Sequence, residues 1–156
     1  MRKIFLKVFV LIASFIVLCL TDMVFAACNI STTSVTFVNY DVFSTVPLDT
    51  TGTITVDCNE SPPPTVTIAI GSSPNSGGFN PRKMKLSGGN DLLSYNFYTD
   101  SNHTRIWGDG SGNTYTLSNR VRRNRPWVST VYGRIPPGQD VSVGNYNETL
   151  TVTITW

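Results

Sequence analysis

Residues 149–156 read Thr-Leu-Thr-Val-Thr-Ile-Thr-Trp, so a threonine alternates with an apolar residue over the whole stretch. Successive side chains of a β-strand point to opposite faces, and this period of two therefore predicts a strand with one apolar and one threonine face. The apolar face consists of Leu150, Val152, Ile154 and Trp156. This is the clearest strand signal in the chain.

Shorter segments of similar character precede this strand, and clusters of Gly, Pro, Ser and Asn separate them. Three consecutive prolines at residues 62–64 and the Gly/Ser-rich residues 71–78 are examples of such breaks. About seven strands without an amphipathic helix predict an all-β, two-sheet sandwich. The other predicted strands are residues 35–38, 53–58, 65–70, 92–98, 115–117 and 128–132.

Length and composition exclude several classes of protein. A chain of 156 residues fits one domain and leaves no room for a multidomain enzyme with separate cofactor and substrate modules. Charged residues make up 14% of the chain, against about 25% in an average domain, while apolar residues make up 40%. This balance excludes a disordered chain, and the low charge argues against a nucleic-acid partner.

The first 26 residues have the pattern of a signal peptide. Three basic residues precede an apolar run at residues 8–20, which is shorter than the roughly 20 residues of a membrane span. We expect cleavage between Ala26 and Ala27, which leaves a domain at residues 27–156 without a transmembrane segment. Removing residues 1–26 takes away three basic residues and one acidic residue, so the formal net charge falls from +2 to zero.

Two cysteines remain in the exported part, because Cys19 leaves with the signal peptide. In an oxidising compartment a disulfide between Cys28 and Cys58 is the default. Lipidation of Cys28 is the alternative, since two alanines precede it, although Phe25 stands where lipoprotein sites usually have Leu. Neither cysteine has a neighbouring Cys or His at the spacing of a metal site.

The sequence predicts no catalytic residue, no metal site and no cofactor. His103 is the only histidine, and we expect it at a solvated hairpin tip over residues 100–104. Asp100 and Asp109 could form a pair for acid–base catalysis, but acidic residues in turns mostly serve the turn itself. Residues 109–113 resemble a calcium loop in their oxygen donors but lack the closing Glu.

One basic cluster is a candidate contact to an anionic surface, with an adjacent tryptophan available for stacking. Its spacing does not place all of its arginines on one face of a strand, and a solvated loop is the alternative. The cluster comprises Arg120, Arg122, Arg123, Arg125 and Trp127.

Several short motifs occur in a fixed order along residues 28–156. They are Cys28; Phe37 with Tyr40-Asp41; Gly52, Val56 and Cys58; Arg82 with Met84; Leu-Ser-Tyr-Asn-Phe-Tyr at 93–98; Trp-Gly-Asp-Gly at 107–110; Tyr-Gly-Arg-Ile-Pro at 132–136 with Gln139; and Gly-Asn-Tyr at 144–146. In this order they resemble the spore coat protein U domain family, which includes subunits of archaic chaperone-usher pili. The resemblance implies an incomplete immunoglobulin-like sandwich that a donor strand from a partner completes.

The last strand agrees with this implication, because no later segment of the sequence pairs with its edge. We expect the donor-strand groove to be lined by Val35, Phe37, Leu150, Val152, Ile154 and Trp156. The implied partners are a periplasmic chaperone, an usher and other pilus or coat subunits. Only Ala27 would precede the first cysteine after cleavage, so the chain has little to donate, which favours a tip or terminal subunit or a coat protein.

The resulting hypothesis is a non-enzymatic, exported structural subunit of a pilus or of a surface or spore coat. It would pass through the periplasm to the cell surface. The alternative is a secreted carbohydrate- or surface-binding module, motivated by Trp107, Trp127 and the arginine cluster. A small secreted hydrolase would need a catalytic set that the sequence does not contain.

Overall fold

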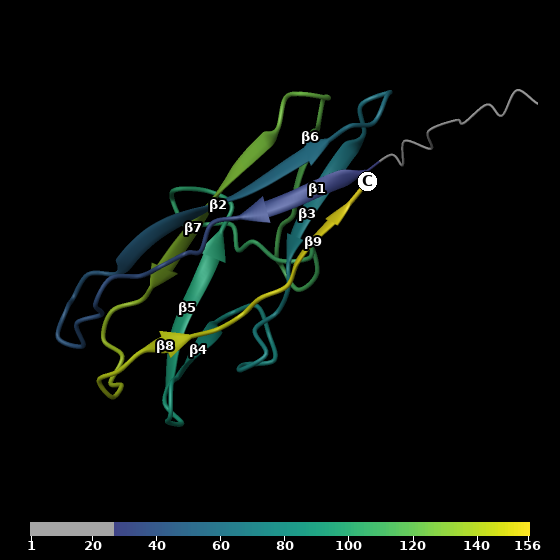
Figure 1. Ribbon diagram of the computed structural model, residues 1–156. Coiled ribbons are helices and arrows are strands. Elements are labelled where there is room, and N and C mark those ends of the chain that lie inside the picture. The colour runs from purple at the N-terminus through teal and green to yellow at the C-terminus, as the bar shows by residue number, and fades with distance from the viewer. Residues whose placement is uncertain (1–26) are drawn as a thin grey trace, which may run out of the picture.

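The protein is a two-sheet β-sandwich, seen in a computed structural model that describes residues 27–156 (Figure 1). A six-stranded antiparallel sheet has the order β1-β2-β7-β5-β4-β8, and a three-stranded sheet has the order β6-β3-β9. The strands are β1 (Cys28–Thr32), β2 (Leu48–Cys58), β3 (Thr65–Ile70), β4 (Arg82–Leu86), β5 (Leu92–Tyr98), β6 (Leu117–Arg120), β7 (Trp127–Ile135), β8 (Tyr146–Asn147) and β9 (Val152–Thr155).

The all-β prediction is confirmed, and the described residues contain no helix. None of them forms an apolar helix long enough to cross a membrane. The predicted signal peptide lies outside the described residues, and so does Ala26 at the predicted cleavage site.

The core lies between the two sheets and follows the period-two pattern of the strands. In β2 the inward side chains include Ile54 and Val56, and in β3 they include Val66 and Ile68. Trp107 is fully buried among them and donates its indole N–H to the Ile68 carbonyl at 3.1 Å. A buried indole N–H needs such an acceptor, and the Ile68 carbonyl provides it within the apolar core.

Residues 35–38 do not form the strand that their pattern predicts. The first strand is β1, and the chain after it crosses the inner face of the large sheet without ladder pairing. Glycines make this crossing possible: a Cβ on Gly52 would lie 2.7 Å from Val35 Cγ2, and one on Gly133 would lie 3.0 Å from Phe37 Cζ. The alternating pattern therefore indicates which side chains face the core. It does not indicate that this segment pairs with a neighbouring strand.

Three strands of the structure, β1, β4 and β8, have no counterpart in the prediction. β4 has the sequence Arg-Lys-Met-Lys-Leu, whose charges hide its strand character, and β8 has only two residues. The predicted strand at residues 115–117 is also misplaced, since β6 begins at Leu117 and Tyr115 makes only an isolated bridge to Trp107. These strands depend on their partners across the sheet, which local propensity does not specify.

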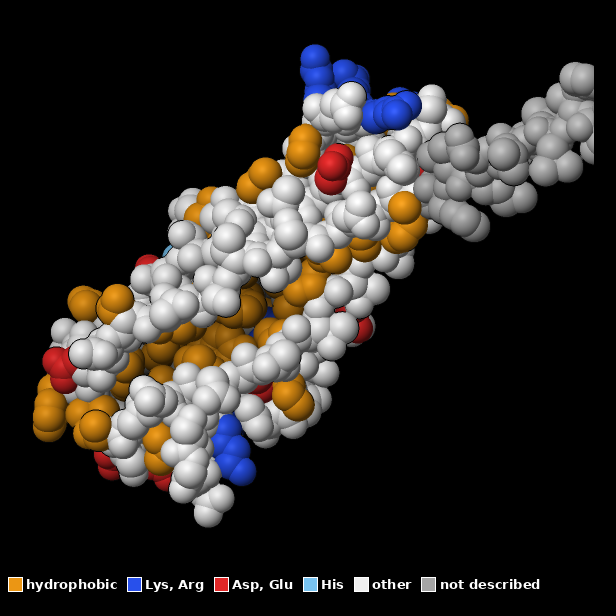
Figure 2. All heavy atoms as spheres, viewed as in Figure 1, with side chains coloured by type: hydrophobic (Ala, Val, Ile, Leu, Met, Phe, Trp, Pro, Cys, Tyr) orange, Lys and Arg blue, Asp and Glu red, His pale blue; other side chains and the backbone are white. Residues whose placement is uncertain are grey.

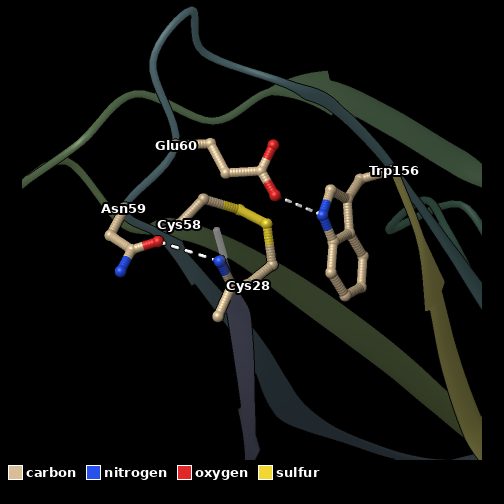
Figure 3. The surroundings of a disulfide bond; sticks show 6 residues. Cys28, Cys58, Asn59, Glu60 and Trp156 are labelled. Carbon is tan, nitrogen blue, oxygen red and sulfur yellow. Dashed lines mark hydrogen bonds between the residues drawn. A yellow bond between two sulfur atoms is a disulfide. The ribbon is translucent and has the colours of Figure 1, made fainter. Parts of the chain in front are cut away.

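The predicted disulfide is present. Cys28 and Cys58 are direct partners in the β1–β2 register, and their Sγ atoms are bonded (Figure 3). Next to the bond, the Ala27 amide nitrogen donates to Asn59 Oδ1 at 2.9 Å. The bridge thereby fastens the first residues of β1, an edge strand, to the central strand β2.

Candidate functional site

Two extended stretches of chain border a groove on one side of the sandwich. The first stretch, residues 28–40, is called here the first bank, and the second stretch, residues 146–155, is called the second bank. Figure 1 shows them running in opposite directions, the first in purple and the second in yellow. Among the described residues, β1 pairs only with β2, and β9 pairs only with β3. Each bank therefore presents an unpaired backbone edge.

The floor of the groove is apolar. Figure 2 shows hydrophobic side chains exposed in a long hollow between two ridges of other atoms. The hollow has two adjoining compartments of about 300 and 400 Å³, and Val35 and Glu148 line both of them. The smaller compartment is floored by Ile54, Ile70, Phe97 and Val131, and the larger one by Met84, Leu93 and Ile135.

The second bank turns alternate side chains toward the interior. Tyr146, Glu148, Leu150, Val152 and Ile154 are half-buried, whereas the residues between them are exposed. β8 belongs to the large sheet and β9 to the small one, so this stretch passes from one sheet to the other. The second bank therefore borders both compartments of the groove.

The structure brings together most of the residues predicted to line the groove. Val35, Leu150 and Val152 line the smaller compartment, and Phe37 lines the larger one. Ile154 packs against the core cluster. Trp156 lines neither compartment, is 55% exposed, and donates its indole N–H to Glu60 beside the disulfide at 2.5 Å (Figure 3).

A polar cluster divides the apolar floor where the two compartments meet. Glu148 Oε2 accepts the Tyr95 hydroxyl at 2.6 Å, and Oε1 accepts the Ser73 hydroxyl at 2.5 Å and Asn75 Nδ2 at 3.0 Å. Burial, followed by the hydrogen bond to this carboxylate, raises the pKa of Tyr95, so its hydroxyl remains a donor. Glu148 thereby fastens the second bank to the loop that follows β3.

Arg82 is fully buried beside this cluster without a carboxylate in direct contact. Its guanidinium donates to the carbonyls of Gly71 and Trp107 and to Asn96 Oδ1 at distances of 2.7–2.9 Å. Burial lowers the pKa of this guanidinium. The side chain joins β4 and β5 to the loops after β3 and β5, so it supports the floor of the groove from below.

The remaining candidates for chemistry lie away from the groove. Burial raises the pKa of Asp100, but the backbone N–H groups of its own turn donate hydrogen bonds to its carboxylate, and together these bonds lower the pKa overall. Asp109 Oδ1 accepts both the amide and the hydroxyl of Ser111, and the hydroxyl bond is the main cause of its lowered pKa. Both carboxylates serve their turns. The described residues contain no cluster of three or more His, Cys, Asp or Glu that could hold a metal ion.

The expectation of a solvated His103 is wrong. Residues 100–104 do form a hairpin tip, but the tip folds back and only 7% of the His103 side chain is exposed. The imidazole packs edge-on against Tyr98 and Tyr132, and Nε2 lies 3.8 Å from Asp49 Oδ1. Contacts to strands distant in sequence cause this burial, which local sequence does not reveal.

The arginine cluster occupies the connection between β6 and β7, which contains a tight hairpin turn at residues 122–125 and lies at the end of the sandwich that carries the disulfide. All four arginines are exposed. Trp127 is half-buried and packs against the core. None of these residues lines either compartment of the groove.

A family comparison agrees with this architecture. The model of the Spore Coat Protein U domain matches residues 14–153. The chain belongs to the Spore Coat Protein U domain family. Protein U of Myxococcus xanthus is 32% identical over 109 residues, which cover 68% of this chain and 59% of that relative's length.

A solved structure has the same fold. A chain of the CsuC–CsuE chaperone–tip adhesion subunit pre-assembly complex, from archaic chaperone-usher Csu pili of Acinetobacter baumannii, superposes with a TM-score of 0.56. The sequences are 19% identical, and the match covers 84% of this chain and 40% of that chain. The family member described here therefore has an immunoglobulin-like sandwich, as the resemblance implied.

Sequence reasoning missed the polar residues beneath the groove. Arg82 and Tyr95 stand in the family motifs, but their motif positions do not indicate that they are buried together. Glu148 precedes the alternating strand and carries no local signal of its role. A charged residue at an inward position of an apolar stretch is the one clue that could have pointed to it.

Proposed function

We propose that this protein is an exported, non-enzymatic structural subunit of a chaperone-usher-type pilus or surface coat, and that its groove accepts a β-strand from a partner. The observation that carries the proposal is the apolar groove between two unpaired sheet edges. Residues 1–26 act as the export signal, and the chain passes through the periplasm to the cell surface.

The chemistry of the groove favours an extended peptide over a small ligand. An inserted strand would hydrogen-bond the free edge of β9, as in other cases of β-strand addition. Its alternate side chains would enter the two compartments, and each fully buried aliphatic side chain contributes about 1.5–3 kcal/mol. The same strand would remove an apolar edge that otherwise promotes aggregation.

The proposed partners follow from the type of assembly. A periplasmic chaperone would supply the first strand, and a neighbouring subunit would replace it at the usher. The Csu structure with the same fold is a complex of a chaperone with a tip adhesion subunit. In this scheme the groove is unoccupied only while the strand of one partner is being replaced by the strand of the next.

A pair of variants on one strand tests the proposal. Val152→Asp places a charge on the groove face of β9, whereas Thr153→Asp places the same charge on its exposed face. The full reading frame is co-expressed with a tagged periplasmic chaperone of a chaperone-usher system, and co-purification is measured. We expect Thr153→Asp to be retained like the wild type and Val152→Asp to be lost.

Two further measurements keep this test decisive. Circular dichroism of the exported variants separates loss of binding from loss of folding, and Leu150→Ala provides a milder change in the same compartment. The proposal is wrong if the wild-type chain is equally soluble, monomeric and cooperatively folded with and without the chaperone. It is also wrong if Val152→Asp folds and still co-purifies.

A further inference from the structure

The connection between β6 and β7, residues 120–125, turns in a tight hairpin and is the strongest concentration of charge in the described part of the chain. It carries four of the nine basic residues in the range 27–156, and residues 117–128 contain no acidic residue. None of the four arginines forms an ion pair within residues 27–156. Figure 2 shows basic side chains gathered at the end of the sandwich where Figure 1 places this hairpin.

The geometry of the hairpin brings together arginine side chains that the spacing along the sequence would place on different faces of a strand. Val121 is 1% exposed and anchors the hairpin in the core, so its neighbours Arg120 and Arg122 point to the opposite side. Arg122 and Arg125 are partners in an isolated antiparallel bridge, and their side chains therefore share one face. Arg123 occupies the turn itself. Three arginine side chains thus leave the hairpin on one face, and a fourth leaves it at the tip.

The turn itself is well defined. The Arg125 amide donates to the Arg122 carbonyl at 3.0 Å, and Asn124 takes a positive φ of 59°, which asparagine tolerates. Arg120 Nε donates to the Pro63 carbonyl at 3.2 Å, and Val121 donates its amide to Pro64. Cross-strand like charges destabilise a hairpin, and here the Arg122–Arg125 pair lacks an acidic neighbour. A bound anion would relieve this repulsion.

We propose that this hairpin binds a linear anionic polysaccharide. Guanidinium forks match sulfate, phosphate and carboxylate groups with paired hydrogen bonds. The four arginines spread over the hairpin and are all exposed, so they suit anions repeated along a polymer better than one small anion in a pocket. Trp127 packs against the core, so the hairpin offers no free aromatic ring on which nucleic-acid bases would stack.

The binding surface is independent of the groove. The hairpin lies at the disulfide end, and none of its residues lines either compartment. A subunit whose groove is filled would still present all four arginines to the solvent. Repetition of the subunit in an assembly would then multiply weak contacts to one polymer.

Matched double variants of the exported chain test the proposal. R122Q/R125Q removes two charges from the hairpin, and K83Q/K85Q removes two charges from β4 as a control. Binding to heparin, which is sulfated, and to polygalacturonate, which is carboxylated, is measured between 25 and about 300 mM salt by biolayer interferometry. We expect R122Q/R125Q to weaken binding at least about tenfold and K83Q/K85Q to change it less than about twofold, with tighter wild-type binding at low salt.

The two polymers distinguish the source of the anion, and binding to either one that depends on the hairpin supports the proposal. Thermal unfolding of both variants shows whether each remains folded. Equal weakening by the two double variants would overturn the proposal, because general charge would then explain the binding. Tighter binding to duplex DNA or to vesicles of anionic phospholipid than to either polysaccharide would also overturn it.

Discussion

The close packing of the first bank on the large sheet predicts the effect of one added methyl group. A Cβ on Gly133 would lie 3.0 Å from Phe37 Cζ, 3.0 Å from Val35 Cγ1 and 3.2 Å from Thr50 Cγ2. Such contacts are overpacked, and overpacking a core costs about 1–3 kcal/mol. Gly133→Ala also lowers the entropy of the unfolded chain, which stabilises the fold by about 0.4–1 kcal/mol. We expect a net destabilisation of about 1 kcal/mol.

A second glycine isolates the packing contribution. A Cβ on Gly78 would have no neighbour within 4 Å, so Gly78→Ala keeps the entropic benefit without the clash. The difference in unfolding free energy between the two variants should therefore be about 2 kcal/mol. This corresponds to a difference of about 1 M between their urea midpoints. Urea unfolding is followed by tryptophan fluorescence, since Trp107 is fully buried in the folded state.

A double-mutant cycle identifies the contact responsible. Phe37→Ala removes one of the crowded neighbours, so Gly133→Ala should cost at least about 0.5 kcal/mol less in that background. If both glycine variants have the same stability, or if Phe37→Ala leaves the cost unchanged, residues 33–40 do not pack on β7 as described. The groove would then lack the first bank that the proposed function requires.

Three other changes have expected outcomes. Replacing Cys28 and Cys58 by Ser should cost about 3–4 kcal/mol in urea unfolding, because the bridge closes a loop with a sequence separation of 30, and reduction of the wild type should reproduce the loss. Tyr95→Phe should cost about 1–3 kcal/mol in thermal unfolding, because it removes a donor from the part-buried Glu148 carboxylate. The pKa of Asp49 is lowered chiefly by its hydrogen bonds from an arginine of β7, so this carboxylate stabilises the fold above the ordinary Asp value of about 3.9 and ceases to do so as pH falls through the lowered value. The stability difference between wild type and Asp49→Asn should therefore be present at pH 7 and be lost in acid, once the pH falls below the lowered pKa, and a difference that stays constant down to the acid limit of the measurement would contradict this assignment.

Elements with a strong local pattern were predictable. The bounds of β3 and β5 agree with the predicted segments 65–70 and 92–98, and β9 lies within the alternating segment at 149–156. In β3 and β9 the apolar residues Val and Ile take the inward positions, so the environment of a residue follows from its place in the alternation. In β5, Leu93 and Tyr95 follow this pattern, but Asn96 on the opposite face is buried as well. β4 was not predicted because its charged residues obscure this alternation. The burial of Arg82 could not be predicted either, because it depends on hydrogen bonds to carbonyls of distant loops.

The candidate site was predictable in part. Val35 and Phe37 were expected in a donor-strand groove from their apolar alternation and from the family resemblance. In the structure they line the two compartments described above, and acceptance of a donor strand there stays a prediction. Their contact with the large sheet was not expected, because it depends on Gly52 and Gly133, where the missing side chains leave room. Trp156 shares the parity of the last strand but lies beyond the groove, beside the disulfide.

The sequence by itself determined the sandwich class, the disulfide and the family. The period-two alternation of apolar residues, the presence of two cysteines after residue 26 and the order of the motifs can each be read directly along the chain. Only the tertiary structure decided which edges remain unpaired, where the floor of the groove lies, and that the polar cluster around Glu148 divides it. It also decided that a loop histidine is buried and that three arginines share one hairpin face. The physical reason is that these features depend on contacts between residues far apart in the chain, which the order of residues along one strand does not specify.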